Sequence, residues 1–172
     1  MIFLAKFFVT YILLTVMYQS YLDCFNENDV DTITTAVAEH SKALLHLFDV
    51  NFETRKETSD LFIKLIYNDK YVARMIEGCN AVSIIILFIA FIVSFSGKIK
   101  QTLLFIAAGS VVVYFLNVIR IAVLCVLLYC FPEQESFLHK VFFPLFIYGF
   151  VFLLWVVWVN KFSLYAKENT SK

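Results

Sequence analysis

The chain has 172 residues, of which 61% are hydrophobic and 18% aromatic, and its formal net charge is zero. With a mean hydropathy of +0.80, this composition lies well outside the range of soluble domains. It indicates an integral membrane protein, and the balanced charge gives no support to nucleic-acid binding.

Four apolar runs are long enough to cross a hydrocarbon core of roughly 30 Å, which takes about 20 helical residues. They cover residues 2–22, 79–95, 102–131 and 141–159. The first run continues beyond the length of a signal-peptide core and has no small-residue cleavage site, so we interpret it as an uncleaved span. The sequence thus predicts an all-α membrane protein of one domain, residues 1–172, with four transmembrane helices.

The short loops indicate the orientation, because lysine and arginine accumulate on the cytoplasmic side of a membrane protein. The loop at residues 96–101 carries Lys98 and Lys100 and no acid, and the C-terminal tail is also basic. Both are expected in the cytoplasm together with the N-terminus. This arrangement predicts a multi-pass protein of the cell (inner) membrane, with residues 23–78 on the extracytoplasmic side.

The extracytoplasmic segment contains two patterns that predict structure. Apolar residues recur at helical spacing over residues 30–48, which favours an amphipathic helix. Two β-rich runs, residues 61–67 and 71–76, flank a turn and predict a β-hairpin. We expect these elements to cover residues 121–130, where the third apolar run exceeds the length that the membrane core needs.

Three residues that are unusual for a lipid-embedded chain are predicted to meet at the outer membrane face. Cys79 opens the second span, where the free N–H groups of a helix N-terminus favour a thiolate. Arg120 lies 18 residues after Thr102 and so reaches the outer boundary at about 1.5 Å per residue, with Asn117 on the same helical face. His139 begins the fourth span on that side. Together they predict a catalytic site that faces outward.

The order of these residues also carries a resemblance. Glu77-Gly78-Cys79-Asn80-Ala81-Val82-Ser83 leads into a span, Asn117-Val118-Ile119-Arg120-Ile121 follows in the next span, and His139 heads the last one. This arrangement resembles the exosortase/archaeosortase family of membrane cysteine transpeptidases, and most closely the short F-type exosortases. The chain departs from the family in two respects. Longer members have more spans, and many carry glycine where this chain has Ala81.

The resemblance implies an enzyme that recognises a C-terminal sorting signal, which consists of a short motif, a transmembrane helix and a basic tail. Cys79 would attack the peptide carbonyl to give an acyl-enzyme, His139 would act as general base and acid, and Arg120 would stabilise the oxyanion. Asn117 is expected to help position the substrate. The expected partners are membrane-anchored protein substrates, a glycan or lipid acceptor and membrane lipid, and no cofactor or metal is expected.

Two other function classes stay open at this stage. Four cysteines on a chain with an oxidising outer face could indicate a membrane thiol oxidoreductase, although no Cys-x-x-Cys occurs and only Cys24 could reach Cys79. A Cys24 substitution would impair an oxidoreductase and spare a transpeptidase. The other alternative is a non-enzymatic accessory subunit, which would keep its function after Cys79→Ser. The remaining thiols, Cys125 and Cys130, are interpreted as packing residues.

Overall fold

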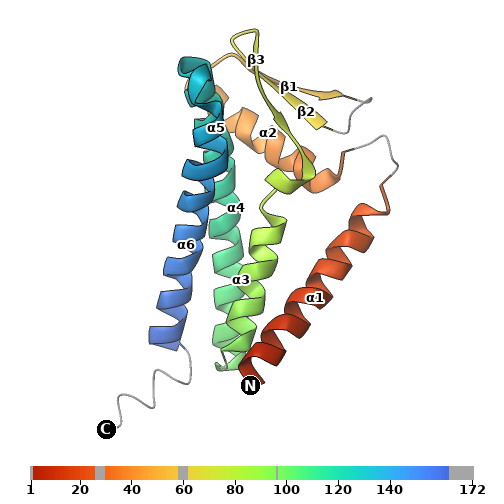
Figure 1. Ribbon diagram of the computed structural model, residues 1–172, viewed down its shortest axis with the longest axis vertical. Helices are drawn as coiled ribbons and strands as arrows, with labels where there is room; N and C mark the ends of the chain where they lie inside the picture. Colours follow the sequence, from red (N-terminus) through yellow and green to blue (C-terminus); the bar gives the residue numbers. More distant parts are fainter. Residues whose placement is uncertain (1, 26–29, 58–61, 96, 163–172) are drawn as a thin grey trace.

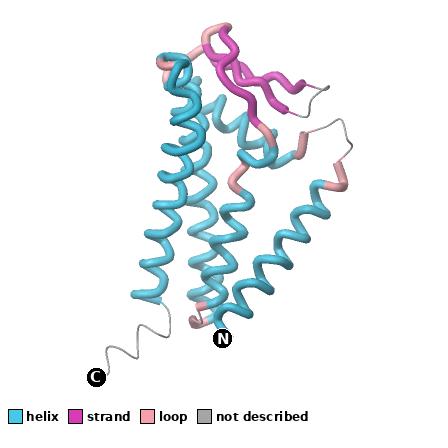
Figure 2. The backbone as a smooth tube through the Cα atoms, in the orientation of Figure 1, coloured by secondary structure: helices cyan, strands magenta, loops and turns pink. Residues whose placement is uncertain are grey.

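The computed structural model describes residues 2–25, 30–57, 62–95 and 97–162 (Figures 1 and 2). Its helices are α1 (Ile2–Leu22), α2 (Thr32–His46), α3 (Val82–Ser94), α4 (Ile99–Cys130), α5 (Glu135–Phe137) and α6 (Phe143–Val157). Its strands are β1 (Phe52–Glu57), β2 (Phe62–Tyr67) and β3 (Lys70–Met75). Helices α1, α3, α4 and α6 make up one part of the molecule, and the sheet with α2 lies over one end of them (Figure 1).

Within the described residues, three helical stretches are long and apolar enough to cross a bilayer: Phe3–Leu22, Ile99–Cys130 and Pro132–Phe162. The second predicted span, residues 79–95, is shorter than expected, because α3 has only 13 residues. At about 1.5 Å per residue, α3 extends only about 20 Å. The cause is a turn at Asn80 and Ala81, where Ala81 has a φ of 66°, so that the helix begins at Val82.

A close contact joins α3 to α4. A Cβ atom on Gly109 of α4 would lie 2.3 Å from Cζ of Phe88 on α3, so the Phe88 ring fits only because this position is glycine. Phe88 is fully buried, and Val151 of α6 belongs to the same apolar cluster. By contrast, α1 exposes apolar side chains along its length, which is typical of a helix in contact with lipid.

The sheet is antiparallel with strand order β1-β2-β3. The turn between β2 and β3 has two residues, Asn68 and Asp69, with φ values of 47° and 60°, the backbone that tight hairpins require. The sequence predicted a two-stranded hairpin, whereas the structure has three strands. We did not predict β1 because its sequence, Phe-Glu-Thr-Arg-Lys-Glu, is mostly charged and buries only Phe52 fully.

Helix α2 lies between the sheet and the end of α4, and it begins where Asp31 accepts hydrogen bonds from the N–H groups of Ile33 and Thr34. Its buried face joins one core cluster with residues of β1, β2 and α4, which are Phe52, Ile63, Leu65, Val118, Ile121, Ala122 and Cys125. The residues of α4 that follow Arg120 are therefore covered as expected. The cover consists of α2 and a three-stranded sheet, where the sequence predicted a helix and a two-stranded hairpin.

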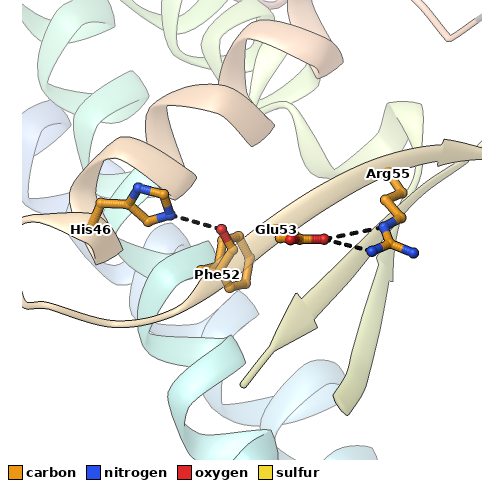
Figure 3. A network of polar contacts seen from close by, with 4 residues as sticks. All are labelled: His46, Phe52, Glu53 and Arg55. Carbon is orange, nitrogen blue, oxygen red and sulfur yellow. Dashed lines mark hydrogen bonds and ion pairs between the residues drawn. The ribbon is translucent and has the colours of Figure 1, made fainter. Parts of the chain in front are cut away.

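Polar contacts fix β1 against α2 and along its own edge (Figure 3). His46 donates from Nε2 to the carbonyl oxygen of Phe52 at 2.8 Å, and Arg55 pairs with Glu53 at 2.8 Å. His40, on the same helix as His46, lies 2.7 Å from the hydroxyl of Tyr114 on α4, measured from Nδ1. Both α2 histidines therefore connect α2 to neighbouring elements.

Candidate active site

Cys79 lies in a tight connection between β3 and α3. The chain leaves β3 at Met75, forms a 3₁₀ turn over Glu77–Cys79, and enters α3 at Val82. The Cys79 side chain is nearly buried, with 9% of its surface exposed. It thus lies three positions before Val82, the first residue of α3.

A cavity of about 530 Å³ opens beside this thiol. Residues 70–76 form one wall, and α4 forms the other through Ile121, Leu124 and Leu128. Pro132 and Glu135, from the corner that follows α4, line the cavity as well, and so does Cys79. The volume falls in the range of typical ligand sites, so the cysteine borders a space large enough for a peptide segment.

Asn117 connects Cys79 to Arg120. Its side-chain amide is fully buried and donates a hydrogen bond of 2.8 Å to the carbonyl oxygen of Cys79. The Asn117 Oδ1 atom also lies 3.4 Å from Nη1 of Arg120, which donates to it. Asn117 therefore connects the backbone of Cys79 to the guanidinium of Arg120.

The Arg120 guanidinium is partly buried and only partly satisfied. Its Nε atom is buried and has no hydrogen-bond partner among the described residues, and a buried N–H without a partner is unfavourable. Cys79 and Tyr148 lie close enough to interact electrostatically with this guanidinium. The site thus combines a thiol, a cation and an unused N–H donor.

A second polar network holds the turn that follows Cys79. Asn80 is 1% exposed, and its amide donates to the hydroxyl of Tyr18 at 2.7 Å and to Oγ1 of Thr34 at 3.0 Å. Its Oδ1 accepts from the N–H of Val82 at 3.0 Å, which satisfies a free donor of the α3 N-terminus. Helices α1, α2 and α3 therefore meet at this residue.

His139 lies in the π-helical segment Leu138–Phe142, which follows α5. This segment is at the end of the molecule that carries the sheet (Figure 1), but the placement of the His139 side chain lies outside the part that the structure describes. The structure thus brings together Cys79, Asn117 and Arg120, while the role of His139 stays a prediction.

Sequence reasoning missed Asn80, Tyr18, Thr34 and Tyr148. For Asn80 a signal existed, because asparagine directly before a long apolar run is a common helix N-cap. Tyr18, Thr34 and Tyr148 have no comparable signal, since each interaction depends on how separate helices pack.

The apolar helices and the cysteine beside a cavity define an integral membrane protein with a thiol-centred candidate site. The model of the transmembrane exosortase family matches residues 2–157 of the chain. The chain therefore belongs to this family, whose members are generally cysteine transpeptidases. Searches of curated proteins and of solved structures found no match.

Proposed function

We propose that the protein is a cysteine peptidase and transpeptidase of the exosortase type, most like the short F-type members. It cleaves C-terminal sorting signals of membrane-anchored proteins and transfers the released protein to a glycan or lipid acceptor at the cell surface. The observation that carries the proposal is the Cys79 thiol, which borders a cavity while Asn117 links its backbone carbonyl to Arg120.

In the first step, the Cys79 sulfur attacks the scissile carbonyl carbon of the substrate. His139 takes the thiol proton and returns a proton to the leaving amine, so that a thioester forms as the C–N bond breaks. In the second step, a hydroxyl or amine of the acceptor attacks the thioester and releases the Cys79 thiol. Water in place of the acceptor would give hydrolysis.

Arg120 is the candidate for stabilising the oxyanion of each tetrahedral intermediate. Its buried Nε has no partner among the described residues, so an oxyanion would gain a donor without displacing an existing hydrogen bond. A fixed donor in a site shielded from water stabilises developing charge more strongly than water does. Asn117 holds the guanidinium from the other side.

We further propose four spans with both termini in the cytoplasm and the site on the extracytoplasmic side of the cell membrane. Asn117 lies 18 residues after the first residue of α4, Ile99. At about 1.5 Å per residue this is roughly 27 Å along the helix, close to the thickness of the hydrocarbon core. The basic loop with Lys98 and Lys100 then lies at the opposite face.

Cleavage of a co-expressed candidate substrate tests the activity. The substrate is a protein encoded next to this gene that ends in a short motif, an apolar span and a basic tail. Cells with the unaltered chain should release the processed protein, and Cys79→Ser should accumulate the full-length form. Cys130→Ser, which changes an exposed thiol on the same chain, is the matched control and should process normally. Normal processing by Cys79→Ser would contradict the proposal and favour an accessory subunit.

Labelling with a membrane-impermeant thiol reagent tests the orientation. The variant used should carry Cys24→Ser and Cys130→Ser, which leaves Cys79 and the buried Cys125. Treatment of intact cells should block processing and modify Cys79. If only permeant reagents reach Cys79, the proposed orientation is inverted.

A further inference from the structure

Strand β3 lies at the edge of the sheet. The strand order is β1-β2-β3, and β3 pairs only with β2 within the described residues. In an antiparallel pair, alternate residues direct their N–H and C=O groups away from the partner strand. The outer edge of β3 therefore presents backbone donors and acceptors that another strand could use.

The cavity beside Cys79 follows this edge. Side chains of a strand alternate between its two faces, so a cavity on one face would be lined by every second residue. Instead, all residues from Lys70 to Ile76 line it in an unbroken run. The cavity therefore reaches the backbone edge of β3 as well as the buried face of the sheet, where Leu65 also lines it. Cys79, three positions after Ile76, lines it too.

The opposite wall of the cavity is apolar, with Ile121, Leu124 and Leu128 of α4. These residues lie on the side of the sheet that carries its buried face, since Ile121 and Leu65 belong to one core cluster. A strand added to β3 would therefore direct alternate side chains toward this apolar wall and the others toward the open face of the sheet.

On the open face, the charge is positive beside β3. Arg55, Lys64 and Arg74 are neighbours across the strands, and like charges opposite one another are unfavourable. Glu53 pairs with Arg55, and Glu57 pairs with Lys64. Arg74 is exposed, lines the cavity and has no ion pair with a described residue. An acidic side chain on an incoming strand could pair with Arg74 in the way that Glu53 pairs with Arg55 and Glu57 with Lys64. We call the three residues Arg55, Lys64 and Arg74 the basic row.

We propose that an extended segment of the protein substrate adds to the sheet along the free edge of β3, places an acidic side chain beside Arg74, and brings its scissile carbonyl to Cys79. This inference rests on the proposed function. The substrate would enter from the outside and continue into the membrane. Strand β3 also leads toward Cys79, since it ends at Met75 and is followed by the turn Glu77–Cys79, so the two strands are parallel. At roughly 3.3 Å per residue, the edge accommodates about six residues.

A tethered peptide tests the docking without any need for cleavage. The probe is a six-residue peptide of threonine and valine with one glutamate. Its C-terminus carries an activated disulfide, which couples it to Cys79. The protein is the purified chain with Cys24→Ser and Cys130→Ser. We expect hydrogen exchange at β3 amides to slow at least tenfold. The matched control peptide carries N-methyl groups on all its amides, cannot approach as a strand, and should leave the exchange unchanged.

The docking would be overturned if the two peptides gave equal hydrogen exchange at the β3 amides, or if the glutamate peptide protected only amides outside β3. It would also be overturned if neither peptide reacted with Cys79 although a small thiosulfonate modifies this thiol. The chemistry is judged separately. Protection of β3 in a chain that cleaves no substrate would contradict the proposed function alone, and cleavage without protection would contradict the docking alone.

Variants of the basic row test the acidic position. Arg74→Ala should slow the tethering of the glutamate peptide about fivefold, as expected for an exposed ion pair, and should not affect a glutamine version. Arg55→Ala is the matched control, because Arg55 lies in the same row but away from the cavity and already pairs with Glu53. If Arg74→Ala slows both peptides equally, or slows neither, this part of the proposal is overturned.

Discussion

The side-chain amide of Asn117 donates a hydrogen bond of 2.8 Å to the carbonyl oxygen of Cys79, across 38 positions of the sequence. This bond attaches the connection between β3 and α3 to the middle of α4, and it leaves Oδ1 of Asn117 facing Arg120. The position of the thiol and the position of the guanidinium therefore depend on one buried amide.

Asn117→Ala should damage both the fold and the activity. The change leaves the Cys79 carbonyl without its donor, and an unsatisfied buried group costs about 1–3 kcal/mol. We expect that loss in the free energy of unfolding in detergent, together with at least a tenfold loss of cleavage. Ser110→Ala on the same helix is the control, because its buried hydroxyl has no partner among the described residues. Equal effects of the two changes would contradict this role of Asn117.

Arg120→Lys should not be a conservative change. An ammonium group cannot reproduce the planar set of donors that contacts Asn117 and leaves Nε free for an oxyanion. We expect the rate of substrate cleavage to fall roughly a hundredfold, the effect of removing an oxyanion donor. Arg55→Lys, on an exposed part of the sheet, should cleave normally. Near-normal cleavage by Arg120→Lys would contradict the proposed role of Arg120 in stabilising the oxyanion.

Ala81→Gly should stabilise the protein. Ala81 has a φ of 66°, a left-handed conformation that costs an L-residue roughly 1–2 kcal/mol and glycine almost nothing. After the larger entropy of an unfolded glycine is subtracted, we expect a gain of up to about 1 kcal/mol in the free energy of unfolding. Ala90→Gly, inside α3, should instead lose about 1 kcal/mol. A loss in both variants would show that the turn needs the Ala81 methyl group.

Gly109→Ala should disrupt the contact between α3 and α4, because the new Cβ would lie 2.3 Å from the Phe88 ring. Overpacking of this kind costs about 1–3 kcal/mol. Gly149→Ala is a matched control, since a Cβ there meets nothing within 4 Å. Thermal unfolding in detergent should separate the two variants, and equal melting temperatures would contradict the packing described for Gly109.

The sequence predicted much of this arrangement because the length of an apolar run and the regular rise of a helix together give the depth of a residue in the membrane. Length counting along α4 brought Asn117 and Arg120 to the level of Cys79, and the surplus of apolar residues after Arg120 required the cover that α2 and the sheet provide. The glycine that many exosortases carry in place of Ala81 matches the left-handed backbone observed at this position.

Other features could not be predicted from local patterns. The charged strand β1 forms because β2 offers it a pairing edge and because Phe52 reaches the core. The bonds from Asn80 to Tyr18 and Thr34 join three helices, and such contacts depend on packing that periodicity does not encode. The short length of α3 follows from the turn that these bonds stabilise.

The most direct measurement is the mass of the Cys79 peptide after the purified protein is mixed with its substrate and quenched with acid. We predict a mass increase equal to the substrate segment on the amino side of the cleaved bond, which hydroxylamine removes, as expected of a thioester. Cleavage that continues in Cys79→Ala, or an adduct that maps to Cys24, would contradict the account.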